Sequence, residues 1–389
     1  MVDYGQMESA TGPTAGVNAP RRVLLGRADW MAVGDAPSVP DSALAPTPAP
    51  RTDEALPLVT RPIRLSDLAA LRRVSAVHRL NQPESQLAPY SPLRAGLRAS
   101  TPGMRARRPF LVACEGDRLV GFAHFAPIPP DNRWLLIALG ASVGVYDAEP
   151  VWEALLATGV RSAGLGGVKR LYARSPDGSP VAPSLRALGW APFARETVYA
   201  GYAVDIRPVN VGRPQGPADT WAMHQLYNAA VPRDVQYAEA FTSHRWDLGG
   251  RRAMTGGSVN GWLLEDGHQL IASARTTSRG DNHMLELIHH PEQPGVIPTL
   301  IDAALATLPV SRAQRVFCAV RGYQAEVASA LAARGFVPVL EQELHVKYTT
   351  VAVRPAAGTT VPFHVDVRDK LPQRVPSFLH GHPCDESPI

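Results

Sequence analysis

The sequence predicts an α/β fold made of two similar halves in tandem, with an irregular segment at each end. Three observations predict it: an internal repeat, short stretches in which apolar and polar residues alternate, and Pro-rich segments at both ends. A chain of 389 residues is long enough for two domains. With 45% apolar and 19% charged residues it can build packed cores, and it does not have the composition of a disordered chain.

The repeat is clearest near the end of each half. The segment Arg170–Tyr202 lines up with Arg315–Tyr348, so that the Gly-Trp pair at 189–190 falls on the Gly-Phe pair at 335–336. An internal repeat has to be recognised before a fold is named, because it sets the number of structural units. Each half is therefore expected to form one α/β unit.

Each half has the same expected order of elements: helix, three strands, helix, strand, helix and strand. A β-hairpin is expected from Asp117 and from Asp266, since apolar and polar residues alternate around a turn. An amphipathic helix opened by proline follows at Pro150–Val160 and at Pro298–Leu308, because proline suits the first turn of a helix. The last strand of each half comes after its Gly-aromatic pair.

Four segments follow from this pattern. Residues 1–57 form a Pro-rich flexible arm, 58–206 and 207–350 form the two α/β domains, and 351–389 form a C-terminal tail. Positive charge is concentrated in the first domain. Positions 58–207 hold 19 basic and 11 acidic residues, and positions 208–350 hold 12 and 13.

The cysteine content and hydropathy predict the compartment. Cys114, Cys318 and Cys384 cannot form a disulfide framework, and Cys318 is expected to be a buried apolar residue. The longest uncharged apolar stretch, Trp134–Tyr146, is shorter than the ~20 residues of a membrane helix, and the N-terminus lacks the pattern of a secretory signal. We expect a cytoplasmic protein that does not associate with membranes. The H-x-H-x-C motif at 380–384 offers three possible zinc ligands and no fourth ligand nearby, so no metal site is predicted.

The endings LRALGWAPFARETVYAGY and LAARGFVPVLEQELHVKY, which follow a hairpin, a strand and a helix, resemble the GNAT acyltransferase superfamily. In that family a small helix, a Gly-aromatic pair and a strand come after the strand that diverges from its neighbour. The resemblance covers both halves, so the chain is similar to a tandem GNAT protein. It implies a mixed, twisted sheet with helices on both faces in each half, and acyl transfer from acetyl-CoA to an amine.

The resemblance also implies where acetyl-CoA binds. In GNAT proteins a loop after the fourth strand carries glycines, which let backbone amides approach the pyrophosphate at a helix N-terminus. In the first half Asp147 and Glu149 occupy this loop and repel phosphates, so no cofactor is expected there. The second half keeps Gln293 and Gly295, although Pro298 has no N–H to donate. The cofactor-binding residues implied are Ile288, His289, Gln293, Gly295, Val296 and Gln324.

Two residues of the second half are candidates for catalysis. The family's tyrosine, which protonates the leaving thiolate, is replaced by Leu185 and Leu331 in the two halves. Tyr323 is a candidate substitute, and the alternative is a tyrosine at a helix start that packs on the neighbouring strand. Glu286 lies on the strand where a GNAT general base is often placed, and the alternative is an outward-facing strand residue.

The densest basic stretch lies in the first half. A carboxylate, phosphate or RNA partner would suit it, and the alternative is a set of solvated surface arginines. Because no aromatic residues are interleaved and no nucleic-acid motif accompanies it, we expect an acidic partner rather than nucleic acid. The residues are Arg94, Arg98, Arg105, Arg107 and Arg108.

Two functions are consistent with these observations. The first is a GNAT-type N-acyltransferase that moves an acetyl or acyl group from acyl-CoA to an amine, using the second half. The second is a catalytically inactive tandem GNAT-like protein that serves as a binding or scaffold module, since both cofactor loops depart from the family pattern. Fold alone does not decide between them.

Overall fold

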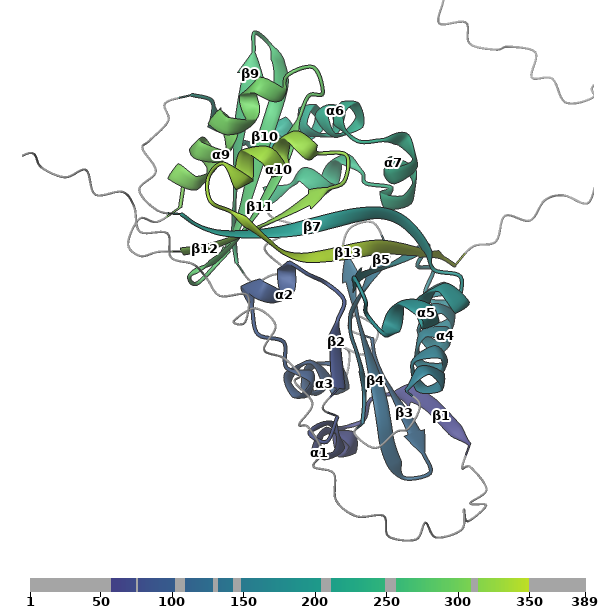
Figure 1. Cartoon of the computed structure of the whole chain (residues 1–389). Coiled ribbons are helices and arrows are strands. Elements are labelled where there is room, and N and C mark those ends of the chain that lie inside the picture. The colour runs from purple at the N-terminus through teal and green to yellow at the C-terminus, as the bar shows by residue number, and fades with distance from the viewer. Residues whose placement is uncertain are drawn as a thin grey trace, which may run out of the picture. The chain divides into compact units, whose positions relative to one another are not determined.

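A computed structural model describes residues 57–74, 76–101, 109–128, 132–142, 148–203, 211–248, 257–308 and 314–349. All of these residues lie in one compact unit of the chain, Met1–Thr349 (Figure 1). The predicted arm, apart from Pro57, and the predicted tail lie outside the described residues. In the part of the chain that is described, no helix is long and apolar enough to cross a bilayer.

The first half has the predicted order of elements, with two additional short strands, one before and one after its first helix. Its strands are β1 (Leu58–Pro62), β2 (Ala76–Arg79), β3 (Phe110–Glu115), β4 (Arg118–Ile128), β5 (Arg133–Ala141), β6 (Arg170–Pro176) and β7 (Ala191–Ala203). Its helices are η2 (Leu65–Asp67), α1 (Leu68–Leu71), α2 (Glu84–Leu87), α3 (Pro92–Ser100), α4 (Glu149–Leu165) and α5 (Val181–Ala187). The additional strands are β1 and β2.

The second half also has the predicted order, with the unpredicted two-residue strand β8 before its first helix and no counterpart of β2 among its described residues. Its strands are β8 (Arg213–Pro214), β9 (Ser258–Asp266), β10 (Gln269–Arg279), β11 (Asn282–His289), β12 (Gln314–Arg321) and β13 (Val337–Tyr348). Its helices are η3 (Pro217–Asp219), α6 (Thr220–Ala230), α7 (Arg233–Glu239), η4 (Ser243–Trp246), η5 (Pro294–Val296), α9 (Ile297–Ala306) and α10 (Ala325–Ala332). Both predicted hairpins are confirmed: β3–β4 and β9–β10 are antiparallel pairs.

The two helices predicted to open with proline are confirmed as α4 and α9. α4 buries Leu155 and Leu156, and α9 buries Leu300 and Ile301, each fully enclosed in the core of its own half. Burial of one such side chain contributes about 1.5–3 kcal/mol. The face that each helix turns to the sheet therefore fixes the helix in place.

The leucines at the family's tyrosine position also belong to the two cores. Leu185 on α5 and Leu331 on α10 have no exposed surface. Cys318 is buried as predicted, and burial raises the pKa of its thiol above the ordinary value, so it stays protonated at neutral pH. None of these three side chains is placed to take part in chemistry at a surface.

The two halves share one sheet of 13 strands, where the sequence predicts a sheet for each half. The strand order is β1-β3-β4-β5-β6-β13-β7-β12-β11-β10-β9-β8, and β2 pairs with β5 off this path. The last strand of each half therefore lies next to the penultimate strand of the other half: β13 pairs with β6, and β7 pairs with β12. The halves have exchanged their last strands.

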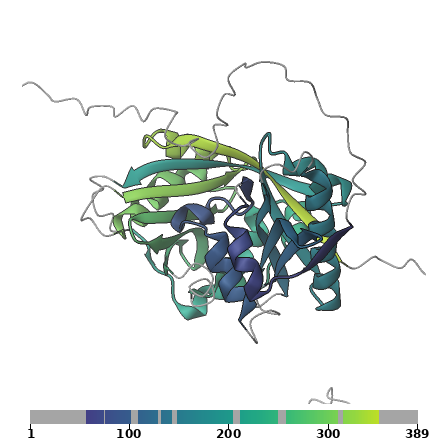
Figure 2. The same cartoon turned by 90° about the horizontal axis from the view of Figure 1, so that it is seen from below.

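The exchanged strands lie side by side at the centre of the sheet. β7 and β13 pair antiparallel, and Figure 2 shows the teal β7 beside the yellow β13. In this register Glu196 faces Gln342, its own equivalent in the repeat, and Gln342 Nε2 donates to Glu196 Oε1 at 2.6 Å. The halves are thus related by an approximate twofold axis that passes through this pair.

Candidate functional site

The parallel strands of each half separate at one end, and we call this region the wedge of that half. In the first half β5 and β6 pair from Arg133–Arg170 to Leu135–Tyr172. In the second half β11 and β12 pair from Asn282–Arg315 to Leu285–Cys318, after which β11 continues to His289. A wedge of this kind is where the family resemblance places the acyl donor.

The first-half wedge is filled by the protein's own main chain. β2 pairs with the separated part of β5, from Ala76–Ala141 to Arg79–Ala138. The next residue, Leu80, joins both strands, since its N–H donates to the Ile137 carbonyl and its carbonyl accepts from the Arg174 N–H, both at 2.9 Å. A main-chain segment thus uses the hydrogen-bonding groups that a ligand in this wedge would need.

The second-half wedge is spanned by a side chain. Gln324, at the start of α10, donates from Nε2 to the Leu287 carbonyl on β11 at 3.2 Å, and its Oε1 accepts from the Arg321 N–H at 3.1 Å. Among the described residues no further strand pairs with β11 here, while α2 of the first half lies against β11. The two wedges therefore differ, although the sequences repeat.

Glu286, the predicted base, is the first residue of β11 beyond the last pair with β12. It lies opposite Arg275 on the neighbouring strand β10. Its Oε1 atom forms an ion pair with Arg245 Nη2 at 2.8 Å. About a quarter of its side chain is exposed. Glu286 is therefore an ion-paired carboxylate at the mouth of the second-half wedge, and neither of the two roles predicted for it is tested by this placement.

Tyr323, the other catalytic candidate, lies between β12 and α10 and is partly exposed. Burial is the main cause that raises the pKa of its phenol above the ordinary value. The positive charge of Arg321 lowers this pKa, and the negative charge of Glu239 raises it further. The phenol is therefore protonated at neutral pH. The charged groups near Tyr323 are those around Arg321, whereas Glu286 pairs with Arg245.

The turn that precedes α9 tests whether acyl-CoA fits the second half. Its amides are partly used within the turn, because the Gln293 N–H donates to the His290 carbonyl at 2.9 Å and the Val296 N–H to the Gln293 carbonyl at 3.3 Å. A Cβ added at Gly295 would meet no atom within 4 Å, so the space beside the turn is open. The turn therefore has room beside it for a ligand, but two of its amides are not available to a pyrophosphate.

The other implied cofactor residues are on β11. Ile288 and His289 are both buried, and the Nδ1 atom of His289 lies 3.1 Å from the His290 carbonyl. Of the basic stretch, Arg94 and Arg98 lie on α3. The remaining three arginines, Arg105, Arg107 and Arg108, lie outside the described residues. The roles of all these residues stay predictions.

A pocket between the two halves adjoins the second-half wedge. Its volume is about 130 Å³. Four arginines and three acidic residues line it together with apolar and aromatic side chains from β4, β5, β6, β7 and β13. Arg321, the last residue of β12, and Arg245, the partner of Glu286, are both in its wall. The charged lining residues are Arg133, Arg174, Arg245, Arg321, Glu84, Glu239 and Asp247.

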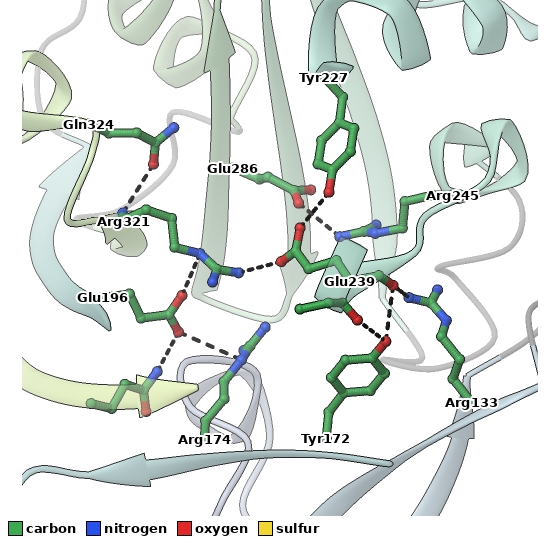
Figure 3. Close-up of polar contacts among 12 residues, drawn as sticks. Arg133, Tyr172, Arg174, Glu196, Tyr227, Glu239, Arg245, Glu286, Arg321 and Gln324 are labelled. Atoms are coloured by element: carbon green, nitrogen blue, oxygen red, sulfur yellow. Dashed lines mark hydrogen bonds and ion pairs between the residues drawn. The ribbon is translucent and has the colours of Figure 1, made fainter. Parts of the chain in front are cut away.

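Glu196 is at the centre of the ion pairs beside this pocket (Figure 3). Only 1% of its side chain is exposed. Arg321 Nε lies 3.0 Å from Glu196 Oε2, and Arg174 Nε lies 3.6 Å from Oε1. Arg174 also pairs with Glu84. Because Arg174 comes from β6 and Arg321 from β12, one carboxylate forms ion pairs with an arginine from each half.

Glu239, at the end of α7, is the second buried carboxylate of the network. Its Oε1 accepts from Arg321 Nη2 at 2.9 Å and its Oε2 accepts from the Tyr227 hydroxyl at 2.8 Å. Its carbonyl accepts from Arg133 and from the Tyr172 hydroxyl. Burial is the main cause that raises the pKa of Tyr172 to about 12. Glu239 thus links a helix of the second half to the sheet of the first.

No family model matches the sequence, and a search of the curated proteins finds no match. Similar solved structures include a GCN5-related N-acetyltransferase from Sphaerobacter thermophilus, 13% identical, which covers 77% of this chain and 99% of its own with a TM-score of 0.49. A tandem GNAT protein from the clavulanic acid biosynthesis pathway is 13% identical over 76% of this chain and 100% of its own, with a TM-score of 0.45.

A third similar structure is a putative acetyltransferase from Pyrococcus horikoshii, 12% identical over 76% of this chain and 90% of its own, with a TM-score of 0.42. The chain is similar in fold to GNAT proteins. Identities this low concern the fold alone, so nothing that these proteins bind or do is transferred to this chain. The two-half architecture itself rests on the strand order and the repeat described above.

Proposed function

We propose that this protein is an N-acyltransferase whose acyl donor binds the second half and whose acceptor is an amine. The observation that carries the proposal is the difference between the two wedges. Main chain from β2 and Leu80 fills the first, whereas the side chain of Gln324 spans the second. A side chain can turn aside for a ligand at the cost of its own hydrogen bonds, each about 1 kcal/mol.

The Leu287 carbonyl would hold the donor's arm once the Gln324 side chain has turned aside from it. A bound thioester supplies an acyl group that is activated for attack by an amine. Glu286 is positioned at the mouth of the wedge to accept the amine proton, directly or through water, and its ion pair with Arg245 keeps the carboxylate oriented. Tyr323, protonated at neutral pH, can supply a proton to the departing thiolate.

Calorimetric titration tests where the donor binds. We expect acetyl-CoA to bind with a micromolar Kd, about −8 kcal/mol. Acetyl-pantetheine should bind within about tenfold of it, since the turn before α9 offers little to the phosphates. Gly295→Glu should weaken acetyl-CoA binding about tenfold by charge repulsion and leave acetyl-pantetheine unaffected. Gly164→Glu on α4, where a Cβ also finds room, is the matched control.

Turnover tests the chemistry. With an amine acceptor found by screening, Glu286→Gln should lower kcat by about 100-fold or more, because a positioned base contributes at least that factor. The melting temperature of Glu286→Gln serves as a check on folding. Unchanged kcat in this variant would remove Glu286 from the mechanism.

A second candidate function is a binding or scaffold module without catalysis. It is favoured by the turn before α9, which uses the Gln293 and Val296 amides internally, and by the ion pair that already holds Glu286. Under this alternative neither acetyl-CoA nor acetyl-pantetheine binds up to millimolar concentration. That result would contradict the acyltransferase proposal and direct the search to macromolecular partners.

A further inference from the structure

The pocket between the halves has room for one ring. Its volume is about 130 Å³. An apolar cavity of about 150 Å³ in another protein binds benzene, so a single aromatic ring is close to the largest group that this space admits. Both halves contribute to its wall, β5 and β6 on one side and α7 and η4 on the other.

One part of the wall is apolar and held in place. Ile128 packs against a buried cluster that contains Leu135 and Tyr172. The Tyr172 and Phe193 rings meet edge to face, with their centroids 6.3 Å apart. Aromatic and aliphatic side chains fixed by such contacts form a surface for an apolar ligand before the ligand arrives.

The charged groups of the wall are largely engaged by the protein itself (Figure 3). Arg245 pairs with Glu286 at 2.8 Å, and Arg321 pairs with Glu196 at 3.0 Å. An anionic ligand would have to displace such a carboxylate, and a cationic ligand would lie among guanidiniums. The wall therefore favours an uncharged ligand. The wall arginines that form ion pairs with carboxylates are Arg174, Arg245 and Arg321.

The guanidiniums favour an aromatic ring over a saturated one. Within the wall, the Phe241 ring centroid lies 4.9 Å from the Arg133 guanidinium and 5.0 Å from that of Arg245. Arg133 also lies 5.8 Å from the centroid of the Tyr172 ring. A guanidinium attracts the face of an aromatic ring, which a saturated ring does not offer. The ring of a ligand would gain from the same interaction.

We propose that this pocket binds an uncharged aromatic ring, and that this ring is the acyl group of the donor. The second part rests on the proposed function. The pocket adjoins the second-half wedge at Arg321, whose N–H donates to Gln324 Oε1 at 3.1 Å. An acyl group is uncharged, whereas an acceptor amine is protonated at neutral pH and would meet the guanidiniums. The donor class that fits is therefore a benzoyl-type thioester.

Calorimetry on the full chain without any acyl donor tests the pocket. We expect benzyl alcohol to bind with a Kd of about 1 mM or below. Cyclohexylmethanol lacks the aromatic face, and benzylamine and benzoate carry a charge, so each should bind at least about tenfold more weakly. The first part of the proposal is overturned if benzyl alcohol does not bind at ~10 mM, or if any of the three other compounds binds as tightly.

Variants of Ile128 locate the binding. Ile128→Trp fills the pocket without changing a charge and should weaken benzyl alcohol binding at least about tenfold. Val59→Trp, at an exposed position of β1, is the matched control and should leave this binding unchanged. Ile128→Ala enlarges the pocket and should tighten the binding of 1-naphthalenemethanol, which has two rings. Unchanged benzyl alcohol binding in Ile128→Trp, or no gain for the larger compound in Ile128→Ala, would contradict the assigned pocket.

Two thioesters test whether the ring belongs to the donor. Benzoyl-pantetheine should bind at least about tenfold more tightly than acetyl-pantetheine, and Ile128→Trp should remove this difference. Equal affinities in the unmodified protein would overturn the acyl assignment. If benzyl alcohol binds and neither thioester does, the acyltransferase proposal fails and the aromatic pocket stands.

Discussion

Glu196 shows how a single residue can hold the two halves together. With 1% of its side chain exposed, its charge has to be compensated inside the protein, since taking an ion out of water costs several kcal/mol. Arg174 supplies this compensation from the first half and Arg321 from the second, and Gln342 adds a hydrogen bond. The network is therefore satisfied only when both halves are folded.

Replacing this buried carboxylate should lower the free energy of unfolding much more than replacing an exposed carboxylate does. Glu196→Gln leaves two arginines without their shared counter-charge, and we expect the free energy of unfolding to fall by about 3 kcal/mol in urea titrations. Glu265→Gln is the matched control, because Glu265 pairs with Arg213 at the surface, where such a pair is worth at most about 1 kcal/mol. Equal losses in the two variants would contradict the assigned role of Glu196.

At the residue scale, the sequence placed three candidate residues in the correct elements, and their roles stay predictions. Glu286, Tyr323 and Gln324 are where the pattern places them, on a strand and at a helix start, because local periodicity reports on local structure. Two other charged residues of the region were missed, because each is distant in sequence from its partner: Arg245 lies 41 residues from Glu286, and Glu239 lies 82 residues from Arg321. One signal was available. Glu196 and Gln342 are polar residues at equivalent positions of the repeat, within strands that are otherwise partly apolar.

At the scale of elements, the second-half wedge should bind the acyl donor more tightly when Gln324 no longer spans it. Gln324→Ala removes the side chain that joins α10 to β11 and frees the Leu287 carbonyl. We expect the Kd of the acyl donor to fall severalfold while the free energy of unfolding falls by about 1 kcal/mol per lost hydrogen bond.

Gln236→Ala is the control for this prediction. Like Gln324, Gln236 on α7 makes two side-chain hydrogen bonds to the main chain, in this case donating to the carbonyls of Asn228 and Val231. It should lose similar stability without a change in donor affinity, as measured by calorimetry. A weaker donor affinity in Gln324→Ala would instead show that the glutamine holds the donor.

The exchange of β7 and β13 was not predictable from local sequence. The two strands are copies of one element, so each has the alternation needed to pair in either half. A second repeat was overlooked: Arg-Pro followed five residues later by Asp, at Arg61–Asp67 and Arg213–Asp219. In both halves the arginine holds the aspartate with two hydrogen bonds of 2.6–2.8 Å. This motif marks the first strand of the second half at Arg213.

At the scale of the whole molecule, two buried histidines should make the free energy of unfolding depend on pH. Burial lowers the pKa of both His78 and His345, so they are neutral in the folded protein, and they bind protons in the unfolded chain below about pH 6.5. The stability they contribute is thus complete above about pH 6.5 and is lost as the pH falls through their folded pKa values.

We therefore expect the free energy of unfolding, measured in urea, to decrease from pH 7.5 to 5.5. His345→Gln should reduce this decrease, because the side chain no longer titrates. Asp67 and Asp219, whose pKa values are lowered by Arg61 and Arg213, lose their contribution only below about pH 4 and do not interfere. Stability that is constant or rising toward pH 5.5 would contradict this assignment.

The exchange of last strands changes what the covalent connection between the halves does. If the chain were cut between Ala203 and Val211, β7 would still lie between β13 and β12, and β13 would still lie between β6 and β7. The two fragments would then be interlocked through the middle of a common sheet, and they would part only if that sheet came apart. The peptide bonds that join the halves bring them together during synthesis, and the strand exchange keeps them together afterwards.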